Sequence, residues 1–126
     1  MSTFDLTGKT AFVTGASRGL GRGFALTLAR AGCDLIITAR EAADCAATKA
    51  EIEALGRKCL SVSLDVRDYD SIQRAVAQAE ANGRPIDILV NNAGCNRRKR
   101  ALEVTWDDWN TVLETNLRGT FFVAQA

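Results

Sequence analysis

The sequence has 126 residues, of which 47% are hydrophobic and 25% are charged, a composition typical of one globular domain. The 16 lysine and arginine residues nearly balance the 15 acidic residues, and the resulting net charge of +1 argues against a surface for nucleic acid. No apolar run is long enough to span a bilayer and the N-terminus lacks a signal-peptide pattern, so we expect a cytoplasmic protein without membrane contact.

Apolar runs alternate with helical patterns along the chain, after a short lead-in over residues 1–8. The predicted strands cover residues 9–14, 34–38, 59–64 and 86–90, and the predicted helices cover residues 19–31, 41–55 and 71–81. The first two strands are almost continuously apolar, which is typical of strands covered on both faces. The third alternates apolar with small polar side chains, which suits an edge strand.

A last helix is predicted from Thr105 to Ala126. Thr105 is a suitable N-cap, and Asp107 and Asp108 follow it in the first turn, where acidic side chains are favourable. The regular alternation of strands and helices predicts βαβ units with right-handed crossovers, and therefore an α/β fold with a doubly wound parallel sheet.

Four cysteines, Cys33, Cys45, Cys59 and Cys95, are widely separated and form no C-x-x-C pair. The sequence contains no histidine to complete a mixed zinc site. We therefore predict reduced thiols and no metal site.

A glycine-rich turn joins the first predicted strand to the first predicted helix. A strand, such a turn and a helix N-terminus form a cradle for a pyrophosphate, because glycines allow close backbone approach and the helix offers free N–H groups. A tight turn without a ligand is the alternative that this motif alone leaves open. The residues predicted to form the cradle are Thr14, Gly15, Ser17, Arg18, Gly19, Leu20 and Gly21.

The glycine spacing is G-x-x-x-G-x-G, and the segment TGASRGLG resembles the cofactor loop of the short-chain dehydrogenase/reductase family. Asp65, the segment Asn91–Gly94 and Asn116 extend the resemblance over nearly the whole chain. The resemblance implies a Rossmann-type sheet with strand order 3-2-1-4. It also implies a reaction in which hydride moves between an alcohol or ketone and a nicotinamide cofactor.

The resemblance assigns further roles at the carboxyl ends of the strands. Asp65 would accept a hydrogen bond from the adenine amino group while Val66 packs near the ring, although an aspartate after a strand is often only a turn residue. Asn92, Ala93 and Gly94 would line the cofactor site. Asn116 would help to hold a water in the proton relay that reaches the catalytic lysine of the family. The alternative role for this asparagine is a local kink or a polar contact within the helix.

Arg40 follows the second predicted strand, at a position where an acidic side chain would bind the ribose of NAD. Alanine precedes it where NAD-dependent members of the family tend to have aspartate, and Arg18 lies in the glycine-rich turn. The two arginines would bind a 2′-phosphate, so we predict NADP rather than NAD. The alternative is that both are solvated surface charges.

The catalytic serine and Y-x-x-x-K motif of the family have no counterpart here, because Tyr69 is the one tyrosine and Gln73 follows it four residues later. The predicted order also leaves the strand over 86–90 as an apolar edge, which natural proteins usually cover. We therefore expect residues 1–126 to be the N-terminal, dinucleotide-binding part of a single domain. The C-terminal catalytic half is expected to lie outside this sequence, and the chain alone to be inactive.

A basic run, Arg97–Arg100, follows this predicted cofactor segment, and in isolation it is a solvated charged loop. Its pattern with the residues that follow resembles gluconate-type and related polyol dehydrogenases, which implies an acidic substrate such as a sugar acid. Related enzymes form dimers or tetramers, so a homo-oligomer is expected. The rival hypotheses are a stand-alone nucleotide-binding module and a truncated product without function.

Overall fold

The computed structural model describes residues 4–126, so the first three residues of the predicted lead-in lie outside the description. Four parallel strands form one sheet in the order β3-β2-β1-β4, which confirms the predicted fold class and strand order. The strands are β1 (Thr10–Val13), β2 (Asp34–Ala39), β3 (Cys59–Ser63) and β4 (Ile88–Val90). The strand over 59–64 lies at an edge, as its alternating pattern predicts.

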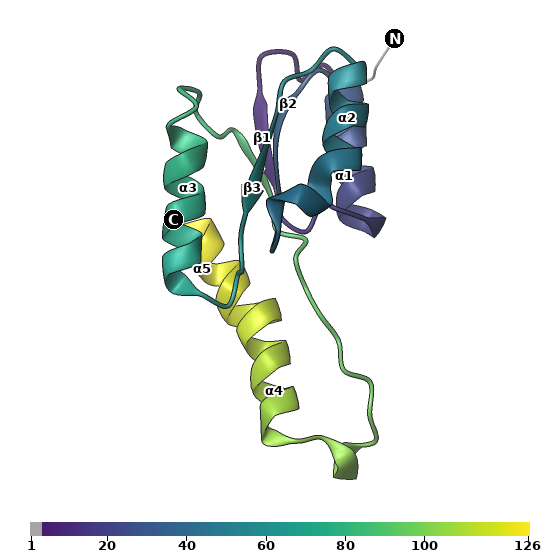
Figure 1. Ribbon diagram of the computed structural model, residues 1–126, viewed down its shortest axis with the longest axis vertical. Coiled ribbons are helices and arrows are strands. Elements are labelled where there is room, and N and C mark those ends of the chain that lie inside the picture. Colours follow the sequence, from purple (N-terminus) through teal and green to yellow (C-terminus); the bar gives the residue numbers. More distant parts are fainter. Residues whose placement is uncertain (1–3) are drawn as a thin grey trace.

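Helices cover both faces of the sheet (Figure 1). Helices α1 (Gly19–Arg30) and α2 (Ala46–Ala54) lie on one side, and α3 (Tyr69–Glu80) and α5 (Thr120–Gln125) lie on the other. The strand side chains divide accordingly between two cores: Leu35 and Ile37 pack with the first helix pair, whereas Phe12 and Ile36 pack with the second. This two-sided burial explains why β1 and β2 are almost wholly apolar.

The outer edge of β4 has no partner strand among residues 4–126, since β4 pairs only with β1. Leu89 in this strand is 39% exposed although its neighbours in β1 are fully covered. The apolar edge expected from the sequence is therefore present in the described part of the chain.

The α-helix predicted over residues 41–55 begins later than predicted, at Ala46. Residues Ala42–Cys45 form a short 3₁₀ helix, η1, before α2 starts. The backbone N–H of Ala42 donates to the hydroxyl of Ser63 at 3.0 Å, which ties this segment to the end of β3. The helix predicted over 71–81 starts two residues earlier, because the carboxylate of Asp68 accepts bonds from the N–H groups of Asp70 and Ser71.

The single helix predicted from Thr105 is instead three helical segments. They are α4 (Trp106–Leu113), the π-helical segment η3 (Glu114–Gly119) and α5. Gly119, the last residue of η3, packs so closely on the chain after β3 that a Cβ would lie 2.6 Å from the carbonyl oxygen of Val66. The hydroxyl of Thr120 also donates to the carbonyl of Asn116 at 3.0 Å within this turn.

Residues 91–100 have no regular secondary structure and lead to a further 3₁₀ turn, η2 (Ala101–Glu103). Figure 1 shows this connection running from the sheet to the lower end of the molecule, where α4 returns toward the sheet. Thr105 caps α4 as predicted, and its capping box is completed by Asp108. No helix in residues 4–126 has the length and apolar character needed to cross a membrane.

Candidate functional site

A cavity of ≈ 900 Å³ lies at the carboxyl ends of the strands. Its size is near the top of the usual range for small-molecule sites, about 300–1,000 Å³. The four strands contribute to one edge because they are parallel, so residues far apart in the sequence meet there. Of the residues predicted from the sequence, the cavity is lined by Gly15, Ser17, Arg18, Gly19, Arg40, Asp65, Val66, Asn92, Ala93 and Gly94.

The glycine-rich turn needs its glycines for two different reasons. Gly15 and Gly19 have φ angles of 65° and 59°, a region that residues with a Cβ rarely adopt. Gly21 instead allows close packing, because a Cβ there would overlap the carbonyl oxygen of Gly15 and lie 2.6 Å from the amide nitrogen of Asn92. Gly21 therefore supports the cavity wall from behind, whereas the side chain of Leu20 is 72% exposed and lies outside the cavity lining.

The N-terminus of α1 faces the cavity without a protein cap. Arg18 at the N-cap makes no capping hydrogen bond, and the first turn holds no acidic side chain. By contrast, α3 and α4 are capped by Asp68 and Thr105. The free N–H groups and the positive end of the α1 dipole thus point to an anionic ligand, and the glycine turn leaves room for it.

Thr14 is completely buried and lies behind the cavity wall. Its hydroxyl oxygen accepts hydrogen bonds from the backbone N–H groups of Asn92 at 2.9 Å and Ala93 at 2.8 Å. The side-chain amide of Asn92 in turn donates to the carbonyl of Gly15 at 3.2 Å. These bonds connect the ends of β1 and β4, so Thr14 positions the residues around the cavity and does not itself line it.

Arg18 and Arg40 line the same cavity, together with Ala39 at the end of β2. Asp44 and Arg67 also contribute to the lining, although no sequence motif indicated either residue. Asp44 comes from η1, whose start depends on a contact with β3 that no local pattern reveals. Arg67 stands two residues after Asp65, and its backbone N–H donates to the carboxylate of Asp65 in an Asx turn, which brings Arg67 to the same wall.

The carboxylate of Asp65 is held by the residues beside it. It accepts a hydrogen bond from the backbone N–H of Arg67 at 3.0 Å and one from the Nε of the same residue at 3.4 Å. Partial burial raises the pKa of Asp65, but these bonds and the charges of Arg67 and Arg40 outweigh it, so the pKa lies below its usual value. Asp65 is therefore an ionised hydrogen-bond acceptor at the cavity wall.

Asn116 lies in the π-helical segment η3 and lines a second cavity with Asn91 and Gly94. Its side chain binds the backbone of Cys95 on both sides: the Oδ1 accepts from the N–H and the Nδ2 donates to the carbonyl, each at 2.8 Å. Asn91 donates from its side-chain amide to the carbonyl of Thr120 at 3.1 Å. Both asparagines thus fasten the segment after β4 to the helical segments that return to the sheet.

The basic run is divided between the cavity and the surface. All four residues of the run are exposed, and Arg97 also lines the cavity, whereas Arg98, Lys99 and Arg100 do not. Arg97 and Lys99 both form ion pairs with Asp108, which is only 5% exposed. The sequence pattern identified Asp108 only as a first-turn acid, because its burial depends on how the loop folds over α4.

The four cysteines are free thiols, and no group of three metal-ligating side chains occurs in residues 4–126. The site therefore combines an uncapped helix N-terminus, two arginines, an ionised aspartate and backbone groups from the segment after β4. Such an arrangement can bind a ligand with phosphate groups at one end and hydrogen-bonding rings along its length.

Comparison with known proteins places this geometry in a known group. The family model described as short chain dehydrogenase matches residues 9–126. The chain is 46% identical over 127 residues to 2-dehydro-3-deoxy-D-gluconate 5-dehydrogenase of Escherichia coli strain K12, covering 100% of this chain and 49% of that protein. It is 42% identical over 123 residues to gluconate 5-dehydrogenase of Gluconobacter oxydans strain 621H, covering 98% of this chain and 48% of that protein.

A solved structure has the same arrangement of elements. The crystal structure of a short-chain type dehydrogenase/reductase from Mycobacterium marinum matches with a TM-score of 0.93 and 34% identity, over 97% of this chain and 48% of that one. The chain thus spans about half the length of the proteins that it matches.

Proposed function

Because the chain belongs to the short-chain dehydrogenase family, we propose that the intact protein is an NADP(H)-dependent oxidoreductase that interconverts an alcohol and a ketone by hydride transfer. Residues 1–126 are then the N-terminal, dinucleotide-binding part of a single domain. The observation that carries the proposal is the cavity at the carboxyl edge of the sheet. There the uncapped N-terminus of α1 lies next to the carboxyl ends of the strands.

The residues around this cavity fit a dinucleotide. The backbone between Gly15 and Gly19 would hold the pyrophosphate, which replaces the missing cap of α1. Asp65 would accept a hydrogen bond from the adenine, beside Val66. Asn92, Ala93 and Gly94 would lie along the nicotinamide half of the cavity. When bound, the nicotinamide supplies or accepts the hydride.

NADP is proposed over NAD because two basic side chains line the cavity near the end of β2. Arg18 and Arg40 both line the cavity, and Ala39 occupies the place where a carboxylate would bind a ribose. A 2′-phosphate would form charge-assisted hydrogen bonds with the two guanidinium groups. The test is a titration of the intact protein with NADPH and with NADH, followed by cofactor fluorescence. Equal affinities would contradict the cofactor assignment.

A sugar acid is the proposed substrate class. Arg97 brings a guanidinium to the cavity from the loop after β4, next to the predicted nicotinamide end. Similar proteins are named as dehydrogenases of gluconate and of a gluconate derivative, which supports an acidic polyol. The test is turnover of D-gluconate with NADP⁺ by the intact protein, compared with neutral D-sorbitol. Binding of cofactor without turnover of any polyol or ketone would favour a nucleotide-binding module instead.

We also propose that Asn116 takes part in proton transfer by holding a water, as the resemblance implies. The support is its place in the π-helical segment, where backbone carbonyls depart from the α-helical pattern. The groups that exchange a proton with the substrate would come from the part of the protein outside these residues.

A homo-oligomer is the proposed state of the intact protein. Large apolar side chains follow one another at intervals of three or four residues along α4, η3 and α5. Trp106, Trp109, Leu113, Leu117 and Phe121 are 83%, 61%, 39%, 67% and 59% exposed. An exposed stripe of this kind is typical of a protein–protein contact, and analytical ultracentrifugation of the intact protein tests it.

A further inference from the structure

Asp108 is a buried carboxylate whose two oxygens both bind cationic side chains of the loop after β4. Its Oδ1 accepts from the Nη1 of Arg97 at 3.0 Å. Its Oδ2 accepts from the Nζ of Lys99 at 2.6 Å and from the backbone N–H of Thr105 at 3.0 Å. The capping box alone needs only the bond to Thr105. The ion pairs with Arg97 and Lys99 are therefore not required for capping α4. We call Asp108, Arg97 and Lys99 together the acid clamp.

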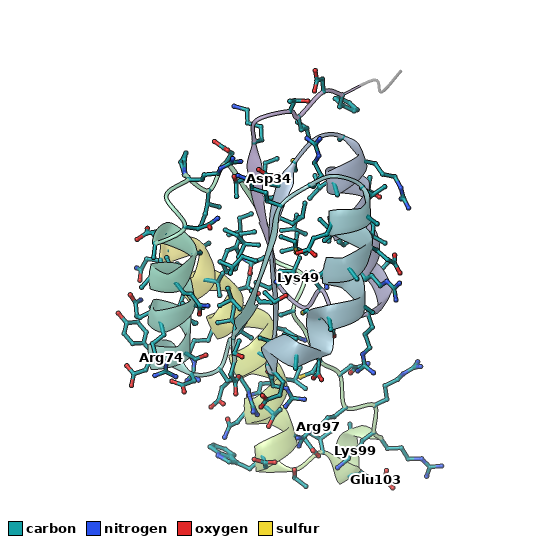
Figure 2. All side chains as sticks on the ribbon, turned by 45° about the horizontal axis from the view of Figure 1, so that its top comes forward. Asp34, Lys49, Arg74, Arg97, Lys99 and Glu103 are labelled. Carbon is teal, nitrogen blue, oxygen red and sulfur yellow. The ribbon has the colours of Figure 1, made fainter. Side chains whose placement is uncertain are left out.

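The acid clamp attaches a loop that has little else to hold it. Residues 91–100 form no regular secondary structure, and residues 96–100 are exposed. Upstream, Cys95 is tied to Asn116 through two hydrogen bonds, but the chain beyond it is joined to α4 mainly by the clamp. Figure 2 shows Arg97 and Lys99 with Glu103 at the end of the molecule away from Asp34.

The electrostatics of the clamp are stable around neutral pH. The ammonium of Lys99, the N–H of Thr105 and the guanidinium of Arg97 hold the pKa of Asp108 far below its usual range. Its carboxylate is therefore charged wherever the protein is folded near neutrality, and both ion pairs persist. A loop held in this way does not need a bound ligand to take its position.

Only one nitrogen of the Arg97 guanidinium, Nη1, is bound to the carboxylates of α4. Its Nη1 is shared between Asp108 and the exposed Asp107, whose Oδ2 lies 3.1 Å away. The Nε and Nη2 groups have no hydrogen-bond partner within residues 4–126, and the side chain lines the large cavity. A guanidinium has five N–H donors in a planar fork, so one edge can bind Asp108 while another binds a carboxylate.

We propose that Asp108 is a positioning residue that, through the acid clamp, fixes Arg97 so that the free edge of its guanidinium receives the carboxylate of the substrate. The inference rests on the proposed function, because it requires a sugar acid in the cavity. Without the clamp, binding would have to order both the loop and a long, flexible side chain, and affinity for the acid would fall.

The test compares Asp108→Asn with Glu103→Gln in the intact protein. Glu103 is an exposed acid close in sequence whose carboxylate pairs with no cation in residues 4–126, so its variant matches the change in charge. We expect Asp108→Asn to raise KM for D-gluconate about tenfold, the effect of losing one well-placed charge-assisted bond. The kcat, the KM for NADP⁺ and the KM for D-sorbitol should stay within twofold, and Glu103→Gln should change none of them.

Lys99→Met provides a second variant, since it weakens the clamp and leaves the capping box of α4 intact. It should raise the KM for D-gluconate in the same direction. Backbone order parameters of residues 96–100, measured by NMR relaxation, should fall in both clamp variants and not in Glu103→Gln. They report the order of the loop without reference to turnover.

Lower order parameters with an unchanged KM for D-gluconate would overturn the inference, as would an equal loss of kcat with the acid and the neutral substrate. Unchanged order parameters in both clamp variants would overturn it as well. If the unaltered protein turns over D-sorbitol and no sugar acid, the proposed substrate class fails first, and the role of Asp108 falls with it. Normal D-gluconate turnover in the unaltered protein together with a normal KM in Asp108→Asn contradicts only this inference.

Discussion

The hydroxyl of Thr14 accepts the backbone N–H of Asn92 at 2.9 Å and thereby joins the end of β1 to the end of β4. The same oxygen accepts the N–H of Ala93 at 2.8 Å, and Thr14 is fully buried. One side chain therefore binds two backbone groups beside the proposed cofactor site; the N–H of Asn92 also donates to the carbonyl of Val90 at 3.1 Å, whereas the N–H of Ala93 bonds to Thr14. β1 and β4 pair over only three residues each, and these bonds fix the chain where that pairing ends.

Replacing Thr14 by Val should leave the N–H of Ala93 without an acceptor while keeping the shape of the side chain, whereas the N–H of Asn92 keeps its bond to the carbonyl of Val90. Because unpaired polar groups in partly buried positions are unfavourable, we expect the free energy of unfolding to fall by about 1–3 kcal/mol. Urea denaturation measures the change. Thr14→Ser keeps the hydroxyl and should retain most of the stability; a Val variant as stable as the unaltered protein would show that the bonds contribute nothing.

Gly21 and Gly23 offer a matched pair of substitutions in the first turns of α1. A Cβ on Gly21 would overlap the carbonyl of Gly15, whereas a Cβ on Gly23 would meet nothing within 4 Å. We expect Gly21→Ala to distort the glycine turn, lower the melting temperature and abolish NADPH binding. Gly23→Ala should bind NADPH normally. Its free energy of unfolding should rise by about 0.5–1 kcal/mol, because alanine favours a helix more than glycine does. Calorimetry and a fluorescence titration distinguish the two, and normal binding by Gly21→Ala would contradict the packing argument.

Much of this site could be predicted because its residues stand directly after apolar runs. Gly15, Arg40, Asp65 and Asn92 each follow a strand, and parallel strands bring their carboxyl ends to one edge. Local patterns predicted the alternation of strands and helices and the edge position of β3, whereas the strand order 3-2-1-4 came from the resemblance to the short-chain dehydrogenase/reductase family.

The remaining features depend on contacts between distant segments. The π-helical segment η3 forms where Gly119 meets Val66, and neither residue reveals this contact in its own neighbourhood. Asp108 looks like an ordinary first-turn acid until the loop carrying Arg97 folds onto it. Sequence periodicity reports which residues share a helix face, but it cannot report which distant group will approach that face.

Cys59 should make stability sensitive to alkaline pH. Burial raises the pKa of its thiol to about 12, whereas a thiol in the unfolded chain titrates near ~8.5. Between these values the folded chain keeps the proton and the unfolded chain releases it, so the free energy of unfolding falls as pH rises. We expect Cys59→Ala to lose less stability between pH 8 and pH 10 in urea denaturation under reducing conditions.

The buried thiols of Cys33 and Cys45 also have raised pKa values through burial, so part of the alkaline dependence should remain in the Cys59→Ala variant. The substitution also removes packed atoms, which lowers stability equally at each pH and leaves the slope as the readout. Parallel pH profiles for the two proteins would show that Cys59 does not titrate as expected.

Arg40 tests the cofactor preference most directly. It lines the cavity beside Ala39 at the end of β2. Arg40→Asp would remove one cation from the proposed 2′-phosphate site and supply a carboxylate able to accept hydrogen bonds from a ribose. Losing a charge-assisted bond of about 1.5–3 kcal/mol should weaken NADPH binding roughly tenfold to a hundredfold, while NADH binding stays equal or improves.

The control is Arg30→Asp, which makes the same charge change at the far end of α1, away from the cavity, and should alter neither affinity. Fluorescence titrations of both variants with both cofactors give the ratio of affinities. An unchanged NADPH-to-NADH ratio in Arg40→Asp would mean that this arginine is a solvated surface charge, and the preference would then have to come from Arg18 alone.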